Sequence, residues 1–529
     1  MVNERASLVA NSIQLCCEQK KTVMRRSRSR SACGCTNVAY GSNRGRACCA
    51  GKQTQRHTER IRRIFTGSQK HSKRHKGEEK TMNFIKEPEK KIPIIDEVDL
   101  VVVGGSCTGV FAAVRAARLG LRVAVVEKQN CFGGVATAGT VNIWHSLHDT
   151  VGERQIIGGL TQEILDRLTT RNAVLASPEP SSAFHLNTEE LKIELDELVM
   201  EHEIKPYLHS FYVAPVLKEQ KLDAIIIENK NGRGAIRAEQ FVDATGDADL
   251  ALDLQLPTFV PETLQPPTTC AKISGLNALG GFNWEQAISE HGAEFGLVPD
   301  WGWGGSIPGL PAIQFRAHTH VFGCDTSDAN QLSYAEIEGR RQVRAITDLI
   351  RKYGPTDAEI VLVDLAATIG ARETKRIAAG YRLTGDDVLH GRRFEDAIAN
   401  GSYRVDIHHT DSPGITFRYL NGTEDVLPGS GLPSIHKRWR DPIDTDPTFY
   451  QIPWRCLLQD HIPNLVLAGR MLDADKIAFS AARVMVNMNQ TGEAAGVACA
   501  IAVKQNLPIQ RVDPAGIRET LAKGGSIII

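Results

Sequence analysis

The stretch Val98-Asp99-Leu100-Val101-Val102-Val103-Gly104-Gly105-Ser106-Cys107-Thr108-Gly109 decides the fold. Its first six residues are mostly apolar, as in a strand buried within a parallel sheet, and they run directly into a glycine-rich turn. Small residues then predict a helix over 110–119, ended by Gly120, and residues 122–126 predict a second strand that ends on Glu127. This order of strand, turn, helix, strand and acid is the dinucleotide-binding fingerprint.

Each part of the fingerprint has a physical task. Gly104 permits the tight turn, and Gly109 lets the helix pack closely on the strand. The start of the helix presents free N–H groups and the positive end of its dipole to a pyrophosphate. Glu127 can accept hydrogen bonds from ribose hydroxyls. Ser106 replaces the second glycine, so its side chain narrows the approach, although its hydroxyl can donate to a phosphate oxygen.

Three further segments favour FAD over NAD. Residues 127–139 carry Gly133-Gly134 soon after the acid, residues 241–247 form a strand ending in Ala-Thr-Gly-Asp, and residues 464–470 form a strand ending on Gly-Arg. With these segments the chain resembles the large bacterial family of FAD-dependent oxidoreductases that have the glutathione-reductase-like (fumarate reductase-like) FAD-binding fold. Blocks 370–377 and 450–455 resemble the same family, and the likeness extends from about residue 95 to 505.

The resemblance implies an α/β fold, a three-layer Rossmann-like FAD-binding domain with an inserted mixed α/β substrate domain. We expect the FAD-binding domain over 91–250 and 441–510, the substrate domain over 251–440, and a C-terminal tail over 511–529. In similar enzymes the helix predicted here over 486–503 aims its N-terminus at the flavin and stabilises the reduced, anionic form.

The resemblance also implies which residues hold FAD. A Gly-Gly loop passes under the cofactor because only glycine lets the backbone approach so closely. Val213, at the start of a β-rich meander over 206–236, offers backbone groups to the adenine. The predicted cofactor-binding residues are Gly104, Gly105, Ser106, Cys107, Thr108, Gly109, Glu127, Lys128, Gly133, Gly134, Thr137, Val213, Ala244, Thr245, Gly246, Gly469, Arg470 and Gly492.

The N-terminal part of the chain is different in kind. Residues 1–81 carry 19 Lys/Arg against 5 Asp/Glu and no sustained apolar period, so we expect a disordered basic tail over 1–90. This segment is a basic tail of the protein, a targeting peptide, or translated sequence upstream of a true start at Met82. We favour the last of these three interpretations. Since the whole chain has no net charge, the remainder is acidic, which argues against nucleic acid as its partner.

Other classes of protein are excluded by what the motifs lack. No apolar run approaches the roughly 20 residues of a membrane span. The six cysteines after residue 100 are scattered singly, as in a reduced, cytoplasmic protein, and no metal-ligand spacing occurs. A disulfide reductase would need a second nucleotide fingerprint and a cysteine pair after the Gly-Gly loop, whereas Cys131 stands alone before it. We interpret Cys131 as a buried thiol rather than a flavin attachment.

Few residues are candidates for chemistry. Arg372 could hold a substrate carboxylate or another anion in a two-pronged contact, or pair with Glu373 for structure. His408, in a predicted loop with Asp406 and His409, and His145, soon after the Gly-Gly loop, could move a proton. A surface or core role is the alternative for each histidine. Arg455 is another possible anion clamp.

These features predict an FAD-dependent oxidoreductase that transfers a hydride between a small-molecule substrate and the flavin, with oxygen or a separate electron carrier as its redox partner. The alternatives are a flavoprotein that uses FAD in a redox-neutral reaction and a non-catalytic nucleotide-binding scaffold.

Overall fold

The computed structural model describes residues 84–177 and 183–529, all of which belong to the unit Arg46–Ile529. Met82 and most of the predicted basic tail lie outside the described residues.

A parallel sheet lies at the centre of the fold, and the predicted strand β1 is its middle. Leu100–Val103 of β1 pair with β2 on one side and with β9 on the other. These residues are buried on both faces, because Leu100 and Val102 pack in one hydrophobic core and Val101 and Val103 pack in another. The parallel strands follow the order β6 (Lys205–Tyr207), β2 (Val123–Val126), β1 (Ile94–Val103), β9 (Gly232–Asp243) and β22 (Leu465–Leu467).

Strand β9 belongs both to the parallel sheet and to the antiparallel meander. Its first half pairs antiparallel with β8 (Lys221–Asn229), which pairs with β7 (Phe211–Lys218) in the predicted meander. Its last residues pair parallel with β22. The predicted strand that ends at Ala244-Thr245-Gly246 is therefore the last part of β9, which begins at Gly232 and changes its neighbour half-way along.

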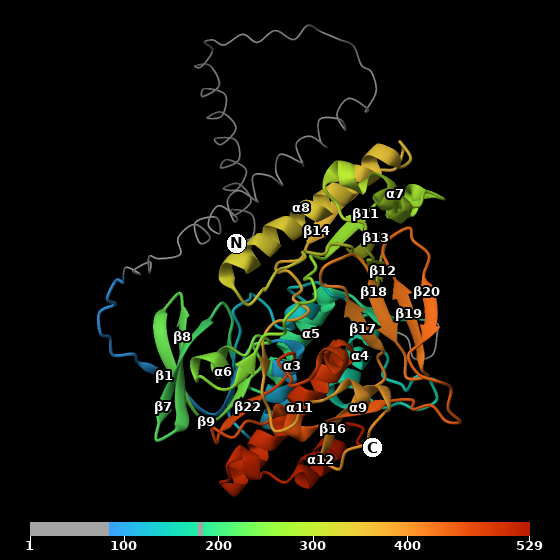
Figure 1. Ribbon diagram of the computed structural model, residues 1–529. Helices are drawn as coiled ribbons and strands as arrows, with labels where there is room; N and C mark the ends of the chain where they lie inside the picture. Colours follow the sequence, from blue (N-terminus) through green and yellow to red (C-terminus); the bar gives the residue numbers. More distant parts are fainter. Residues whose placement is uncertain (1–83, 178–182) are drawn as a thin grey trace, which may run out of the picture. The chain divides into compact units, whose positions relative to one another are not determined.

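Helices cover one face of the sheet, and the meander with α6 (Asp249–Asp253) covers the other (Figure 1). Helix α3 begins at Cys107, earlier than predicted, because the Ser106 hydroxyl accepts a hydrogen bond from the Gly109 N–H and caps it. The three layers confirm the predicted Rossmann-like α/β class. The helical layer comprises α3 (Cys107–Arg118), α4 (Gly159–Thr170), α5 (Thr188–Glu201) and α11 (Met485–Gln505).

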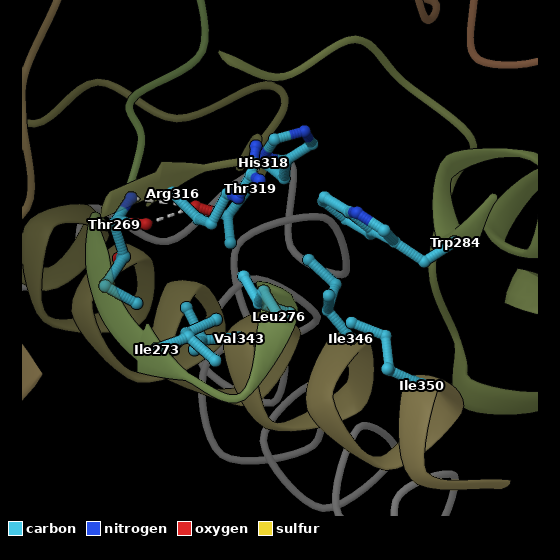
Figure 2. A pocket seen from close by; sticks show the side chains of 11 residues that line it. Thr269, Ile273, Leu276, Trp284, Arg316, His318, Thr319, Val343, Ile346 and Ile350 are labelled. Carbon is cyan, nitrogen blue, oxygen red and sulfur yellow. Dashed lines mark hydrogen bonds between the residues drawn. The ribbon is translucent and has the colours of Figure 1, made fainter. Parts of the chain in front are cut away.

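The chain between the two parts of this domain builds further sheets. Strands β12 (Trp303–Ile307), β13 (Leu310–Ala317), β11 (Ala271–Ser274) and β14 (Val361–Leu365) form one antiparallel sheet, against which α7 (Trp284–His291) and α8 (Ala329–Tyr353) pack. Figure 2 shows the apolar pocket between them, with Leu276, Ile346 and Ile350 pointing into it. A second antiparallel sheet comprises β17 (Val405–His408), β18 (Ile415–Arg418), β19 (Thr423–Leu427) and β20 (Ile435–Arg438).

Residues on both sides of residue 440, where we expected the inserted domain to end, belong to the same hydrophobic core. Strand β16 (Ala397–Gly401) pairs with β21 (Tyr450–Pro453), and both share one hydrophobic core with α3 and α11. The predicted C-terminal tail is also built in. It contains α12 (Pro514–Lys523), and the side-chain amide of Asn400 donates to the carbonyl of Ile527 at 2.9 Å.

Short elements complete the described part. They are β3 (Ile143–Trp144), β5 (Phe184–Leu186) and β4 (Val174–Ala176) in one small sheet, the pair β10 (Thr258–Phe259) and β15 (Arg376–Ile377), and the helices α9 (Gly385–Leu389) and α10 (Lys476–Ala482).

Helices α3 and α11 approach one another more closely than side chains would allow. A β-carbon on Gly492 would lie 2.0 Å from the carbonyl oxygen of Thr108, and one on Gly496 would lie 2.0 Å from that of Ala112. Gly492, which we predicted to bind the cofactor, therefore has a packing contact with α3.

We predict that Gly492→Ala lowers the free energy of unfolding by about 1–3 kcal/mol, because backbone cannot move aside as a side chain can. Thermal and denaturant unfolding would measure the loss. Gly516→Ala on α12 is the matched control, since its β-carbon meets nothing closer than Ile501 at 3.9 Å and the helix gains propensity. Equal stability of the two variants would contradict this account of the contact.

Candidate active site

The predicted nucleotide turn lies at the carboxyl end of the parallel sheet. Gly104 has φ +99°, and a β-carbon there would lie 2.4 Å from the carbonyl oxygen of Ala244, so the turn is pressed against the end of β9. The buried carboxylate of Glu127 accepts hydrogen bonds from the N–H groups of Gly105 and Gln129, each at 2.7 Å. These two bonds hold Glu127 at the turn and leave lone pairs on its oxygens for a further donor.

The Gly-Gly loop lies directly against this turn. The N–H of Gly133 donates to the carbonyl of Gly105 at 2.8 Å, and Gly133 forms a parallel bridge with Ser106. Gly134 has φ +58°, and its β-carbon would lie 2.9 Å from that of Ser106. Thr137 closes the loop by donating its hydroxyl hydrogen to the carbonyl of Phe132.

The remaining predicted segments meet at the same place. Gly469, at the end of β22, lies beside Thr108 of α3 and donates its N–H to the hydroxyl of Thr491. The Ala244-Thr245-Gly246 turn faces Gly104, as described above. Val213 is the residue that a bulge in β7 leaves without a partner in the register with β8. Lys128 is exposed.

Arg470 has a role that the sequence did not show. Its guanidinium donates to the Asp247 carboxylate at 2.7 Å and to the Thr374 hydroxyl at 2.6 Å. We predicted it to contact the cofactor, but these bonds make it a link between the turn after β9 and the block that contains Arg372.

These residues fit a flavin dinucleotide. The start of α3, the acid, the two glycine loops and the end of β22 surround one place, and the first turn of a helix leaves N–H groups for phosphate. Beyond the Gly-Gly loop, the Thr140 hydroxyl and both polar atoms of the Asn142 side chain are buried with no hydrogen-bond partner in the described part of the chain. Unpaired buried polar groups are costly, so a ligand with polar edges suits this segment.

A cluster of ionisable side chains lies next to that segment. Ala367 and Thr368 donate their N–H groups to the carbonyl of Ala138, and Gly370 lies beside Val141, so the chain leading to Arg372 crosses the segment after the Gly-Gly loop. The cluster consists of His145, Asp300, His320, Arg372, Tyr403, Asp406, His408 and Arg483.

His408 is at the centre of the cluster. Its ring lies 5.1 Å from that of His320, and its Nε2 lies 3.5 Å from the Asp406 carboxylate. Its Nδ1 is buried and has no hydrogen-bond partner among the described residues. Burial, together with the charges of Arg372 and Arg483, holds the pKa of His408 well below its ordinary value, so the ring is neutral at pH 7.

His145 joins the cluster through Tyr403. The two rings lie 3.9 Å apart, and the Tyr403 hydroxyl donates to the Asp406 carboxylate at 3.0 Å. Burial and the nearby guanidinium of Arg404 lower the pKa of His145 to about 3. The structure thus brings together all three residues that we predicted for catalysis, Arg372, His408 and His145.

Sequence reasoning missed His320, Arg483 and Asp300. They come from three distant parts of the chain, and no local spacing connects them to Arg372 or His408. His320 Nδ1 lies 2.9 Å from the Asp300 carboxylate, whose other oxygen accepts the N–H of Gly414.

Three expectations for this region were wrong. His408 is in strand β17 rather than in a loop, because residues 405–408 pair with β18. Arg455 forms a half-exposed ion pair with Asp396 at 2.9 Å and is not in the cluster. The alternative that Arg372 pairs with Glu373 also fails, since Glu373 pairs with Arg376.

Residues 84–177 and 183–529 contain neither a metal site nor a membrane-spanning helix. No group of three or more His, Cys, Asp or Glu side chains there could hold a metal ion. None of the helices in those ranges is long and apolar enough to cross a membrane.

A family model described as FAD dependent oxidoreductase matches residues 99–521. The chain belongs to this family. Membership confirms two predictions, that the cofactor is FAD and that the protein is an FAD-dependent oxidoreductase rather than a non-catalytic scaffold.

Individual relatives of this family member are distant. Dihydrolipoyl dehydrogenase from Trypanosoma brucei brucei is 35% identical over 77 residues, which are 13% of this chain and only 16% of that protein. Among solved structures, a geranylgeranyl bacteriochlorophyll reductase-like protein from Thermoplasma acidophilum is 11% identical, with a TM-score of 0.41 over 81% of this chain and 83% of that one. A p-nitrophenol 4-monooxygenase from Pseudomonas putida is 12% identical, with a TM-score of 0.35 over 54% and 70%.

We predict that Glu127→Ala weakens FAD binding at least about tenfold. The change removes a charged acceptor that holds the turn and would also remove its bonds to the ribose, each worth roughly 1.5–3 kcal/mol. The flavin-to-protein absorbance ratio and titration of the apoprotein would measure the loss. Glu197→Ala, on the exposed face of α5, should keep wild-type flavin content; equal content in both variants would contradict the assignment of Glu127.

A second prediction concerns acid stability. The native state keeps His408 neutral, whereas the unfolded chain protonates it below about pH 6.5, so the free energy of unfolding falls as the pH falls through that value. His408→Asn cannot titrate. It should therefore reduce the loss of stability between pH 7 and pH 5 by up to about 2 kcal/mol, since each pH unit below 6.5 contributes about 1.4 kcal/mol.

Denaturant unfolding of the FAD-loaded protein at both pH values would measure that difference. His461→Asn is the control, because the side chain of His461 is exposed and donates to no described residue. If both variants lose as much stability as the wild-type protein, His408 is not held neutral in the native state.

Proposed function

We propose that this FAD-dependent oxidoreductase transfers a hydride between a small-molecule substrate and the flavin, and that His408 moves the accompanying proton. The observation that supports the proposal is the unpartnered, buried Nδ1 of a neutral His408 beside the segment that follows the Gly-Gly loop. Bound FAD supplies the two-electron redox chemistry, and the chain supplies the position of the substrate and the path of the proton.

His408 has the surroundings of a general base. The Asp406 carboxylate, 3.5 Å from Nε2, favours a proton on that nitrogen and so leaves a lone pair on Nδ1. Asp406 is itself held by the hydroxyl of Tyr403 and by the guanidinium of Arg483. When Nδ1 takes a proton from the substrate, the negative charge of Asp406 stabilises the imidazolium; in the opposite direction the imidazolium returns the proton.

Other residues would hold the cofactor. Glu127 would bind the ribose, the start of α3 and Ser106 would face the pyrophosphate, and the loop Gly133-Gly134 would pass beneath it. Burial of His408 and His320, which expose only 5% and 4% of their surface, excludes water from the place where the proton moves.

The finer class is also a proposal. The strand order β6-β2-β1-β9-β22, with a meander branching from β9, supports a glutathione-reductase-like FAD-binding fold. The free, separately buried cysteines of the described part support a reducing, cytoplasmic environment. We propose oxygen or a separate electron carrier as the partner that restores the flavin.

An anaerobic substrate screen tests the proposal. Hydroxy acids, sugars, amines and unsaturated acids would be mixed with the FAD-loaded protein, and bleaching of the visible flavin band would identify a reductant of the flavin. We predict that His408→Asn slows that bleaching about 10²–10⁴-fold with unchanged flavin content, because a positioned proton acceptor contributes a factor of that size.

His409→Asn is the matched control. Its ring contacts Thr416 and Pro413 rather than Asp406 or His320, so its bleaching rate should equal that of the wild-type protein. Equal slowing in both variants would exclude a specific role for His408. Turnover of a substrate without any bleaching would instead indicate redox-neutral use of FAD.

A further inference from the structure

We infer that the substrate is a small carboxylate, bound through its anionic group by Arg372 and Arg483 beside His408 and His320. This inference rests on the proposed function, since it names the substrate class for the same site.

Hydrogen bonds hold the guanidinium of Arg372 in place, but no carboxylate in the described part of the chain forms an ion pair with it. Its Nη1 donates to the carbonyl of Pro266 and to the hydroxyl of Thr268, two uncharged acceptors. No described residue accepts a hydrogen bond from its Nε or Nη2. These two groups form the edge of the guanidinium fork, which matches the two oxygens of a carboxylate.

Arg483 adds a second positive charge to the same place. Its Nη2 donates to the Asp406 carboxylate at 3.3 Å, while its Nε is buried without a partner in the described part. The positive charges of Arg483 and of Arg372 both lower the pKa of His408. Among the described residues, Asp406 is the carboxylate that contacts Arg483, and it also accepts a hydrogen bond from the hydroxyl of Tyr403.

The second acid of the cluster, Asp300, forms no ion pair with Arg372 or Arg483 in the described part of the chain. The backbone N–H groups of Trp301 and Gly414 donate to the same oxygen of Asp300, at 2.7 and 2.8 Å respectively. The other oxygen of Asp300 lies against His320. These contacts of Asp300 are therefore made away from Arg372, on which it acts through its charge alone.

Arginines in the core are treated differently. Arg115, Arg341 and Arg376 are almost completely buried, and each pairs with a glutamate, respectively Glu493, Glu338 and Glu373. Because an unpaired buried charge is costly, each of these three arginines has an acid as its partner. Arg483 contacts Asp406 at 3.3 Å, and Arg372 forms no ion pair with a described carboxylate, so both guanidiniums keep donors that an anionic ligand would accept.

The histidines limit the kind of anion. His408 and His320 are neutral and buried, and His408 Nδ1 and His320 Nε2, which have no partner in the described part of the chain, suit a hydroxyl or carbonyl next to the carboxylate. A site of two guanidiniums and two imidazoles in contact is suited to a small acid rather than to an extended polyanion.

Binding of simple acids to the FAD-loaded protein tests the inference. Oxalate, malonate and lactate would be titrated while the flavin spectrum and the thermal unfolding midpoint are followed. Malonamide and lactamide, which have similar shapes without the charge, are the matched ligands. We expect saturable spectral shifts and raised midpoints with at least one acid, and none with the amides.

Variants then locate the charge. Arg372→Gln and Arg483→Gln should each weaken acid binding about 30-fold or more, because each removes one partner of a buried charged contact. Arg372→Lys should recover only part of the affinity, since lysine cannot make the two-pronged contact. Arg382→Gln is the control: Arg382 pairs with Asp473 at the surface and should leave acid binding unchanged.

The outcomes separate this inference from the proposed function. Protein that binds FAD and is bleached by a neutral alcohol or amine, but responds to no acid, would overturn the inference and leave the proposed function intact. Loss of FAD from Arg372→Gln, with acid binding to Arg483→Gln unchanged, would assign the guanidinium to the cofactor and overturn the inference as well. Protein that acids bind but that no substrate bleaches would contradict the proposed function alone.

Discussion

The backbone contact between α3 and α11 is the constraint on which the rest of the structure depends. Gly492 and Gly496 let α11 lie against the carbonyls of Thr108 and Ala112, and the buried pair of Arg115 with Glu493 joins the same two helices. These helices are separated by more than 350 residues of chain, so the contact holds the two parts of the FAD-binding domain together. It also determines where the start of α3 faces, and therefore where a pyrophosphate can bind.

The nucleotide unit could be predicted because its physics is local. The strand, the turn, the helix and the acid fall within 34 residues, from Ile94 to Glu127, and each has a conformational or hydrogen-bonding reason that the residue type reveals. Pairing across the sheet is not local. Residues 232–243 have the pattern of one strand or of two, and only the positions of β8 and β22 decide that a single strand pairs with both. The same limit applies to the inserted domain, since β16 and β21 join the central core through side chains whose partners are far along the chain.

The candidate site was predictable in part. Arg372, His408 and His145 stood out as ionisable groups near recognisable blocks, and they lie in one cluster. His320 did not stand out, because it is adjacent to Thr319 in a stretch whose alternate residues face different surroundings. Thr319 lines the apolar pocket beside α8 (Figure 2), whereas His320 faces Asp300 and His408. The two residues follow β13 outside any strand, so which of them reaches the site depends on tertiary contacts such as that of Thr319 with Thr269, and a residue type alone cannot show it.

The block Arg372–Arg376 shows how the fold keeps a charge available. Glu373 points to Arg376, which is stacked on Phe479 in the core, and stabilises it there. Had Glu373 turned toward Arg372 instead, it would have cancelled the charge of that guanidinium and left Arg376 buried and unpaired. The carbonyl of Pro266 and the hydroxyl of Thr268 orient Arg372 without neutralising it. Glu373 is thus used to stabilise Arg376 in the core, while the guanidinium of Arg372 keeps its charge for a ligand.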